Sequence, residues 1–298
     1  MSGIEPIELD DVPFFPQTEY QCGPAALATI LAHEDLAVDA EDMVGAVYVE
    51  GLQGSLQAEL LGATRRNGLI PYVLEPQPSA LFAELAAGRP VLILQNLGLT
   101  RVPVWHYAVV VGFDRERDRV ILRSGTERRR LERSARFLRS WGRGDNWAFV
   151  AIRPGAVPAT ATPARYVRAL AGAEGVLPSG DTRAAYDTAL AQWPQDDLVL
   201  FAAAARRHGE RDSQGAAALY RRLLALQPNH AAARNNLANV LAEQGCYRDA
   251  LSQARAALEA IDIGSALYAA ISDTVASIES ASDGEDAAAA QCSVSTVD

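Results

Sequence analysis

The sequence predicts an α+β domain followed by an all-helical domain, and two observations support this division. In the first half, segments with helical periodicity precede segments rich in β-branched residues, which is the order of an α+β fold. Past Pro154 the chain passes through a stretch rich in Ala, Pro and Thr and then becomes alanine-rich and helical. A length of 298 residues suits two domains.

The first half contains four predicted helices and then four predicted strands. Glycine and proline residues separate the helices, and the strands are apolar runs with polar turns between them. The helices are expected at 23–33, 39–48, 55–67 and 79–87, and the strands at 90–96, 106–113, 119–124 and 147–153. We expect the strands to pair antiparallel, because helices followed by antiparallel strands are the order of an α+β fold.

Cys22 stands at the start of the first predicted helix and is followed by Gly23 and Pro24. Proline is well tolerated there, because its missing N–H would be unpaired in the first turn of a helix. The unpaired N–H groups of a helix N-terminus favour a thiolate over a thiol, and the thiolate is the nucleophilic form. Gln17, a few residues upstream, can offer its side-chain amide to an oxyanion beside that sulfur. The pattern predicts a catalytic thiol rather than a structural cysteine.

A cysteine nucleophile requires a base, and the chain has four histidines. His33 lies at the far end of the helix that begins near Cys22, while His208 and His230 fall in the helical second half. His106 remains, at the start of a predicted strand. A histidine on a rigid strand facing a thiol at a helix tip is the arrangement of papain-like thiol enzymes, so His106 is the predicted base.

A third group is needed to orient the imidazole of His106. The polar stretch 114–118 reads as a hairpin turn, which returns the chain beside His106 in the region after the next strand. The candidates that this hairpin brings close are Ser124, Thr126 and Glu127. All three stay open, because the register of strand pairing can shift by two residues.

Residues 10 to 153 resemble the papain-like cysteine peptidases of the bacteriocin-processing group, which cut leader peptides after a double glycine. The matching residues are Gln17, Cys22, Gly23, Ala25, Leu27, His106 and Tyr107. The resemblance implies an α+β papain-like fold and a peptidase with Cys22, His106 and Gln17 in its site. Where the family carries Asp or Asn this chain has Ser124, and the resemblance makes Ser124 the third member.

A period of 34 residues runs through the second half, from Tyr186 to Tyr220 and from Trp193 to Gln227. The clearest copy begins at Asn229, and it resembles the tetratricopeptide repeat, whose paired helices stack on one another. Such repeats imply a protein partner or a recruited substrate. The expected organisation is a peptidase domain at 1–155, a linker at 156–163, repeats at 164–281 and a disordered tail at 282–298.

Composition narrows the function classes and the location. The net charge of −10 argues against a nucleic-acid partner. No apolar run approaches the length of a membrane span, and no secretion signal is visible, so we expect a cytoplasmic protein, with a periplasmic location as the alternative for a processed chain. No Cys/His spacing is typical of a metal site, so neither a metal nor another cofactor is expected.

Two functions fit these residues. In the first, the chain is a cysteine peptidase that acts on a peptide or protein substrate recruited by the helical repeats. In the second, the papain-like half is a catalytically weak binding module in a protein-interaction scaffold. Gln17, Cys22 and His106 favour the first function, and the serine at position 124 favours the second.

Overall fold

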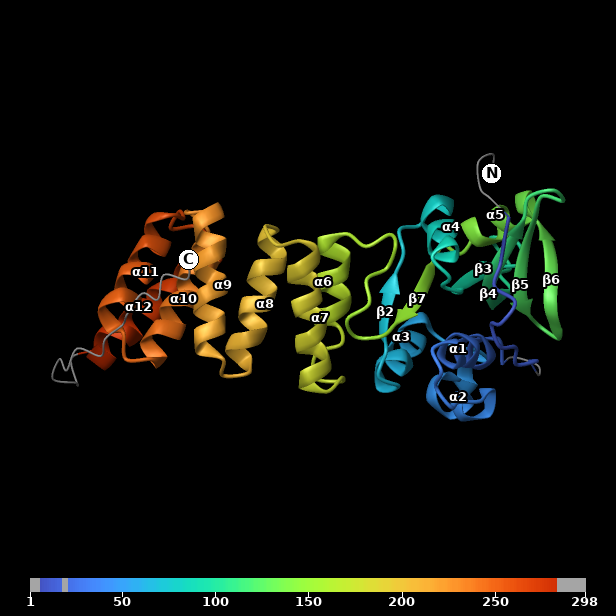
Figure 1. The fold of residues 1–298 in the computed structure, drawn as a ribbon, viewed down its shortest axis with the longest axis horizontal. Coiled ribbons are helices and arrows are strands. Elements are labelled where there is room, and N and C mark those ends of the chain that lie inside the picture. The colour runs from blue at the N-terminus through green and yellow to red at the C-terminus, as the bar shows by residue number, and fades with distance from the viewer. Residues whose placement is uncertain (1–5, 18–20, 283–298) are drawn as a thin grey trace. The chain divides into compact units, whose positions relative to one another are not determined.

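The computed structural model describes residues 6–17 and 21–282. Contacts between Cα atoms divide the chain into two compact units, 1–185 and 186–298. The first unit contains a sheet with helices packed on it, and the described part of the second unit is helical (Figure 1). The predicted fold class is thus confirmed.

The sheet of the first unit is antiparallel. Its strands are β1 (Ile7–Glu8), β2 (Ile70–Val73), β3 (Val91–Asn96), β4 (Trp105–Asp114), β5 (Arg119–Ser124), β6 (Glu127–Arg133) and β7 (Ala148–Ile152). Their order is β2-β7-β3-β4-β5-β6, and β1 pairs with the far end of β4. The four predicted strands correspond to β3, β4, β5 and β7, and each observed boundary lies within one residue of its prediction.

The helices of the first unit include the four that the sequence predicts. They are α1 (Cys22–His33), α2 (Ala40–Val47), α3 (Gln57–Arg66), α4 (Pro78–Ala86), α5 (Ser134–Gly142) and α6 (Pro163–Ala171), with the 3₁₀ turn η1 (Glu50–Leu52) before α3. Helix α1 packs against β4 and is buried along all of its residues from Gly23 to Leu31. Its side chains join those of Tyr107 and Val109 in the main core, which fixes the N-terminus of α1 against the beginning of β4.

Strand β6 and helix α5 have no counterpart among the predicted elements. β6 reads Glu-Arg-Arg-Arg-Leu-Glu-Arg, and among its residues only Glu132 is buried. It forms an edge of the sheet, where charged side chains face water and block pairing with other chains. Two buried aromatic residues, Phe137 and Trp141, fasten α5 to the core.

The stretch expected to be a linker is hydrogen-bonded to the first unit. The buried carboxylate of Glu84 accepts hydrogen bonds from the main-chain N–H and the hydroxyl of Thr160, both at 2.7 Å. Arg89 donates to the carbonyl of Val157 at 3.1 Å, and Tyr72 donates to that of Thr160 at 3.0 Å. Helix α6 follows directly and packs on β2. The expected boundary at residues 155 to 163 therefore falls inside the first compact unit.

The second unit consists of helices that pack in pairs. They are α8 (Asp197–Gly209), α9 (Ser213–Leu226), α10 (Ala231–Glu243), α11 (Tyr247–Glu259) and α12 (Tyr268–Ser282), while α7 (Ser179–Gln192) crosses the division between the units. Helix α8 packs on α9 and α10 on α11, and α9 also packs on α10, so that the pairs stack (Figure 1). Within the described residues, no helix has the length and hydrophobicity of a membrane span. The expected tail lies outside the described residues from 283 onward.

The hydrogen bonds of Glu84 lead to a first prediction. Glu84→Ala removes the buried acceptor of the Thr160 N–H and hydroxyl, and it leaves Arg89 without its ion pair. We expect the free energy of unfolding of the first unit to fall by about 3 kcal/mol, since breaking a buried pair from one side leaves its partners uncompensated. Urea unfolding followed by tryptophan fluorescence measures the change.

The matched control is Glu41→Ala, at an exposed position in α2. We expect it to change the free energy of unfolding by no more than about 0.5 kcal/mol. Equal effects of the two substitutions would show that the segment from 156 to 162 adds nothing to the stability of the first unit.

Candidate active site

A cleft of about 770 Å³ opens in the first unit. Five parts of the chain line it: the segment before α1 with the start of α1, the loop from η1 to α3, strand β3 at Leu94, the start of β4 with the residues before it, and the turn before β7. Gln17, Cys22 and His106 all line this cleft. The structure thus brings together three residues that the sequence places up to 89 positions apart.

Cys22 is the first residue of α1 and carries a free, partly exposed thiol. Burial raises the pKa of this thiol above its ordinary value, although main-chain N–H groups of Tyr107, Gly23 and Cys22 itself act in the opposite direction. The helix N-terminus alone led us to expect a thiolate. That expectation is wrong for the resting protein, because loss of water around the sulfur outweighs the N–H groups that stabilise its charge.

His106 is the second residue of β4 and pairs across the sheet with Gln95 of β3. Its Nε2 lies 2.8 Å from the hydroxyl oxygen of Ser124. Burial lowers the pKa of His106 to about 4, and the nearby positive charge of Arg130 acts in the same direction. The imidazole is therefore neutral near pH 7.

Among the three candidates for the group that holds His106, the structure pairs the imidazole with Ser124. Ser124 ends β5 and is buried, and Gly125 follows with φ +64° in the two-residue turn that leads to β6. Glu127 pairs with Ser124 through the main chain, and its exposed carboxylate lies 3.9 Å from Arg130. In the described part of the chain, no hydrogen bond joins Thr126 or Glu127 to His106.

A serine at this position has two chemical consequences. A hydroxyl can donate or accept a hydrogen bond, whereas a carboxylate can only accept one, so Ser124 permits either tautomer of His106. A neutral partner also stabilises an imidazolium less than a carboxylate does. The pKa of the Cys22 thiol is raised, that of His106 is lowered, and the partner of His106 carries no charge. The thiol and the imidazole therefore rest as a neutral pair.

Gln17 is fixed to the same turn that carries Ser124. Its main-chain N–H donates to the carbonyl of Gly125 at 3.1 Å, and its side chain lines the cleft with Cys22. The end of β5 and the turn that follows it therefore carry Ser124, which contacts the predicted base, and hold the predicted oxyanion donor Gln17.

Large exposed apolar side chains gather at the cleft: Leu52 and Leu56 on one loop, and Val104 and Trp105 at the start of β4. We call these four residues the apolar rim. Periodicity placed Leu56 inside the helix predicted at 55–67 and gave no sign that Leu52 and Leu56 line a cleft. The sequence feature that could have indicated this side of the cleft is the presence of two leucines in a glycine-containing connection, where residues are usually polar.

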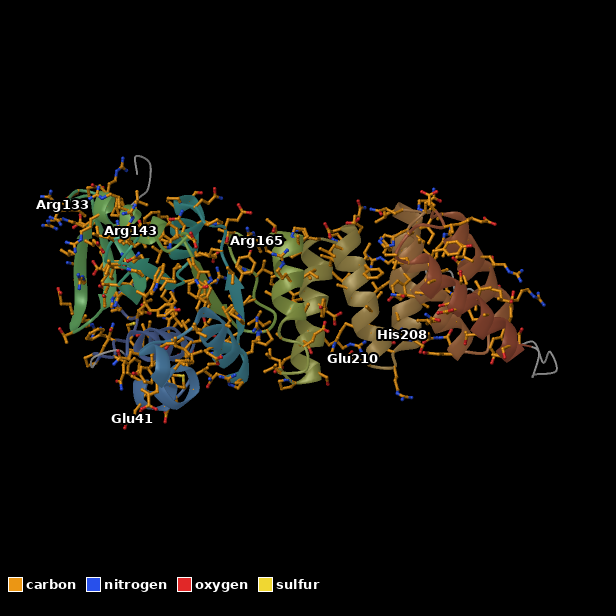
Figure 2. All side chains as sticks on the ribbon, turned by 180° about the vertical axis from the view of Figure 1, so that it is seen from behind. Glu41, Arg133, Arg143, Arg165, His208 and Glu210 are labelled. Atoms are coloured by element: carbon orange, nitrogen blue, oxygen red, sulfur yellow. The ribbon has the colours of Figure 1, made fainter. Side chains whose placement is uncertain are left out.

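The connection from β3 to β4, which bears part of the apolar rim, is braced by Asn96. The side-chain oxygen of Asn96 accepts hydrogen bonds from the N–H groups of Gly98 and Val104, both at 3.0 Å. The guanidinium of Arg143 (Figure 2) donates to the main-chain carbonyl of Asn96, at 3.1 Å from Nε and 2.7 Å from Nη2. This wall of the cleft is therefore a hydrogen-bonded hairpin rather than a loose loop.

The pKa directions lead to a second prediction. Because burial raises the pKa of the Cys22 thiol, its alkylation by iodoacetamide should increase with pH, with a midpoint above that of a cysteine residue in an unstructured peptide measured in parallel. Mass spectrometry of the Cys22 peptide follows the reaction, and Cys22→Ala is the control for labelling elsewhere. A midpoint below that of the peptide cysteine would indicate a preformed thiolate–imidazolium pair instead.

Family models match both halves of the chain. Residues 9–143 match the Peptidase_C39 like family, and residues 219–252 match the tetratricopeptide repeat. No curated protein matches the chain. The peptidase family model indicates a hydrolase, and the repeat indicates interaction with protein.

Three solved structures are similar to about half of the chain. A putative C39-like peptidase from Bacillus anthracis is 17% identical over 50% of this chain and 98% of its own, with a TM-score of 0.43. A double glycine motif protease from an AMS/PCAT transporter, in complex with the leader peptide, is 22% identical over 50% and 97%, with a TM-score of 0.37. The peptidase domain of Streptococcus ComA, a bifunctional ABC transporter, is 19% identical over 48% and 98%, with a TM-score of 0.40.

The motif around Cys22 and the period of 34 residues predicted these two families, and the family models confirm both. Residues 9–143 are thus similar to the C39-like peptidases, and residues 219–252 are similar to the tetratricopeptide repeat.

Proposed function

We propose that the first unit is a cysteine peptidase that hydrolyses a peptide bond of a peptide or protein substrate bound in the cleft. The observation that supports this most directly is the shared lining of one cleft by Gln17, Cys22 and His106, with His106 hydrogen-bonded to Ser124. A nucleophile, a base and an oxyanion donor are the three parts that acyl transfer through a thiol requires.

In the proposed mechanism, the sulfur of Cys22 attacks the substrate carbonyl carbon while His106 takes the thiol proton. Nε2 of His106 faces Ser124, so Nδ1 is the nitrogen that receives this proton. The oxyanion accepts hydrogen bonds from the Gln17 side chain and from the main-chain N–H of Cys22. His106 then gives the proton to the leaving amine, which departs and leaves a thioester. Water hydrolyses the thioester with His106 as base and releases the acid product.

A resting pair without charge sets the character of this mechanism. Because the thiol and the imidazole are both neutral before substrate binds, the charges of the thiolate and the imidazolium arise during the attack itself. The neutral hydroxyl of Ser124 can stabilise the imidazolium only through its dipole and not through a full negative charge. The neutral resting pair is also consistent with the alternative function, a binding module with little catalysis. Acylation of Cys22 distinguishes the two, because only the peptidase is acylated.

The substrate that we propose has apolar residues near the bond that is cut. The apolar rim supports this, since Leu52 and Trp105 are 60% and 53% exposed beside the cleft. We further propose that the repeats recruit the substrate or a partner protein. The hydrogen bonds of Glu84 to Thr160 support a peptidase domain that extends through α6, with the repeats after it.

The test of the function uses p-nitrophenyl acetate, an activated ester that needs no sequence recognition. The wild-type chain should release p-nitrophenolate in a burst and carry an acetyl group on Cys22, detected by mass spectrometry. Cys22→Ala should abolish the burst, and His106→Ala should slow it by about 10²-fold or more, because the general base is lost. A wild-type chain that is never acylated on Cys22 would favour the scaffold function.

The serine at position 124 gives a further prediction. Ser124→Asp places a carboxylate beside Nε2, which should raise the pKa of His106 by stabilising the imidazolium. An imidazolium beside Cys22 in turn lowers the thiol pKa, so the midpoint of alkylation should fall by about one pH unit or more. Acylation near pH 6 should then become several-fold faster, and Ser124→Ala should make it several-fold slower.

Glu127→Gln is the matched control for the Ser124 variants. Glu127 is the neighbouring carboxylate on the same turn, but its side chain is exposed and lies towards Arg130. The alkylation midpoint should therefore stay unchanged. A shift with Glu127→Gln and none with Ser124→Asp would transfer the orienting role to Glu127.

A further inference from the structure

Arg123 of β5 is a buried arginine, 4% exposed, whose hydrogen bonds go to main-chain carbonyls. The three that it makes to the N-terminal segment are Nε to Val12 at 3.2 Å, Nη2 to Leu9 at 3.2 Å and Nη2 to Asp10 at 3.3 Å. A fourth runs from Nη1 to the carbonyl of Arg128 at 2.7 Å. Arginine is rarely buried to this extent, so this arrangement requires a physical reason.

Three of the four carbonyls that Arg123 binds belong to a segment that leads to the active-site cleft. We call residues 9–17 the strap; they follow β1 and contain neither helix nor strand. Arg123 holds the strap at its beginning, and the carbonyl of Gly125 holds its end through the N–H of Gln17 at 3.1 Å. Both anchors lie on the same strand end, one on each side of Ser124.

Further contacts hold the strap at the edge of the sheet. Arg129 forms a bidentate ion pair with Glu8, at 2.6 and 2.8 Å, directly before the strap begins. Arg128 donates to the carbonyl of Asp10 at 3.2 Å. Two arginines, Arg123 and Arg128, therefore hold the strap directly, and Arg129 holds the residue before it.

We propose that Arg123 is a positioning residue for Gln17: by holding the strap, it places the Gln17 amide beside Cys22. This inference rests on the proposed peptidase function. An oxyanion donor must lie within about 3 Å of the developing charge, and a displacement of about 1 Å can cost 10²-fold in rate. A segment without regular structure meets that demand only if other groups fix it.

Arg123→Lys is the informative substitution. Lysine keeps the positive charge and much of the aliphatic stem, but its single ammonium group has three donors at one point and cannot reproduce the planar fork that reaches several carbonyls. The strap should loosen while β5, Ser124 and His106 keep their places. Arg119→Lys, on the same strand and outside this set of hydrogen bonds, is the matched control.

The experiment is a double-mutant cycle on the full chain, with p-nitrophenyl acetate as the acylating probe. Arg123→Lys should slow acylation of Cys22 by about tenfold or more, and Gln17→Ala should slow it by about 10²-fold. Combined with Gln17→Ala, the Arg123→Lys change should cause no additional loss, because the group that it positions is already absent. Arg119→Lys should match the wild-type rate.

A second measurement separates positioning from general damage. Alkylation of Cys22 by iodoacetamide forms no oxyanion, so its rate should stay within about twofold of wild type in Arg123→Lys. If Arg123→Lys does not fold, Arg129→Gln replaces it. That variant removes the ion pair with Glu8 directly before the strap, and it should slow acylation several-fold in the wild-type background and not at all with Gln17→Ala.

The outcomes separate this inference from the proposed function. Absence of acylation in the wild-type chain would refute the peptidase itself. Acylation that depends on Gln17 but not on Arg123 or Arg129 would overturn the positioning role and leave the peptidase intact. A loss of equal size with and without Gln17 would also overturn it, since Arg123 would then act through another group.

Discussion

The candidate site depends on the end of strand β5 and the turn that follows it. Ser124 contacts the imidazole of His106, the carbonyl of Gly125 holds the main chain of Gln17, and Arg123 holds the segment before Gln17. Gly125 makes the turn at φ +64°, a conformation that costs glycine little and most other residues more. Three consecutive residues thus fix two of the three groups that the chemistry needs, and helix α1 supplies the third.

Burial decides the charge state of this site. A helix N-terminus stabilises a nearby negative charge by about 0.3–1 kcal/mol at exposed positions, whereas desolvation shifts the pKa of a fully buried group by up to 3–5 units. For Cys22 and His106 both desolvation effects favour the uncharged form. A carboxylate in the position of Ser124 would oppose this, so the hydroxyl and the desolvation act in the same direction.

Sequence patterns located the parts that depend on local rules. Apolar runs gave β3, β4, β5 and β7, and the Cys-Gly-Pro motif gave the start of α1. The predicted hairpin between β4 and β5 limited the hydrogen-bond partner of His106 to three residues. In the structure the partner is Ser124. Sequence patterns did not locate the parts of the structure that depend on contacts between residues far apart in the chain. The charged strand β6 is recognisable only as the edge of a complete sheet, and the apolar residue types that mark a core do not include a buried arginine such as Arg123.

A thiol that remains protonated between turnovers is also a poor target for oxidants. Peroxides react with the thiolate, and the resulting sulfenic acid can proceed to forms that are not reversed. Burial that raises the pKa of Cys22 therefore favours the less reactive thiol, and in the proposed mechanism the proton leaves when His106 accepts it during attack on a substrate. In the proposed peptidase, the burial that keeps the resting thiol protonated would thus also slow its oxidation.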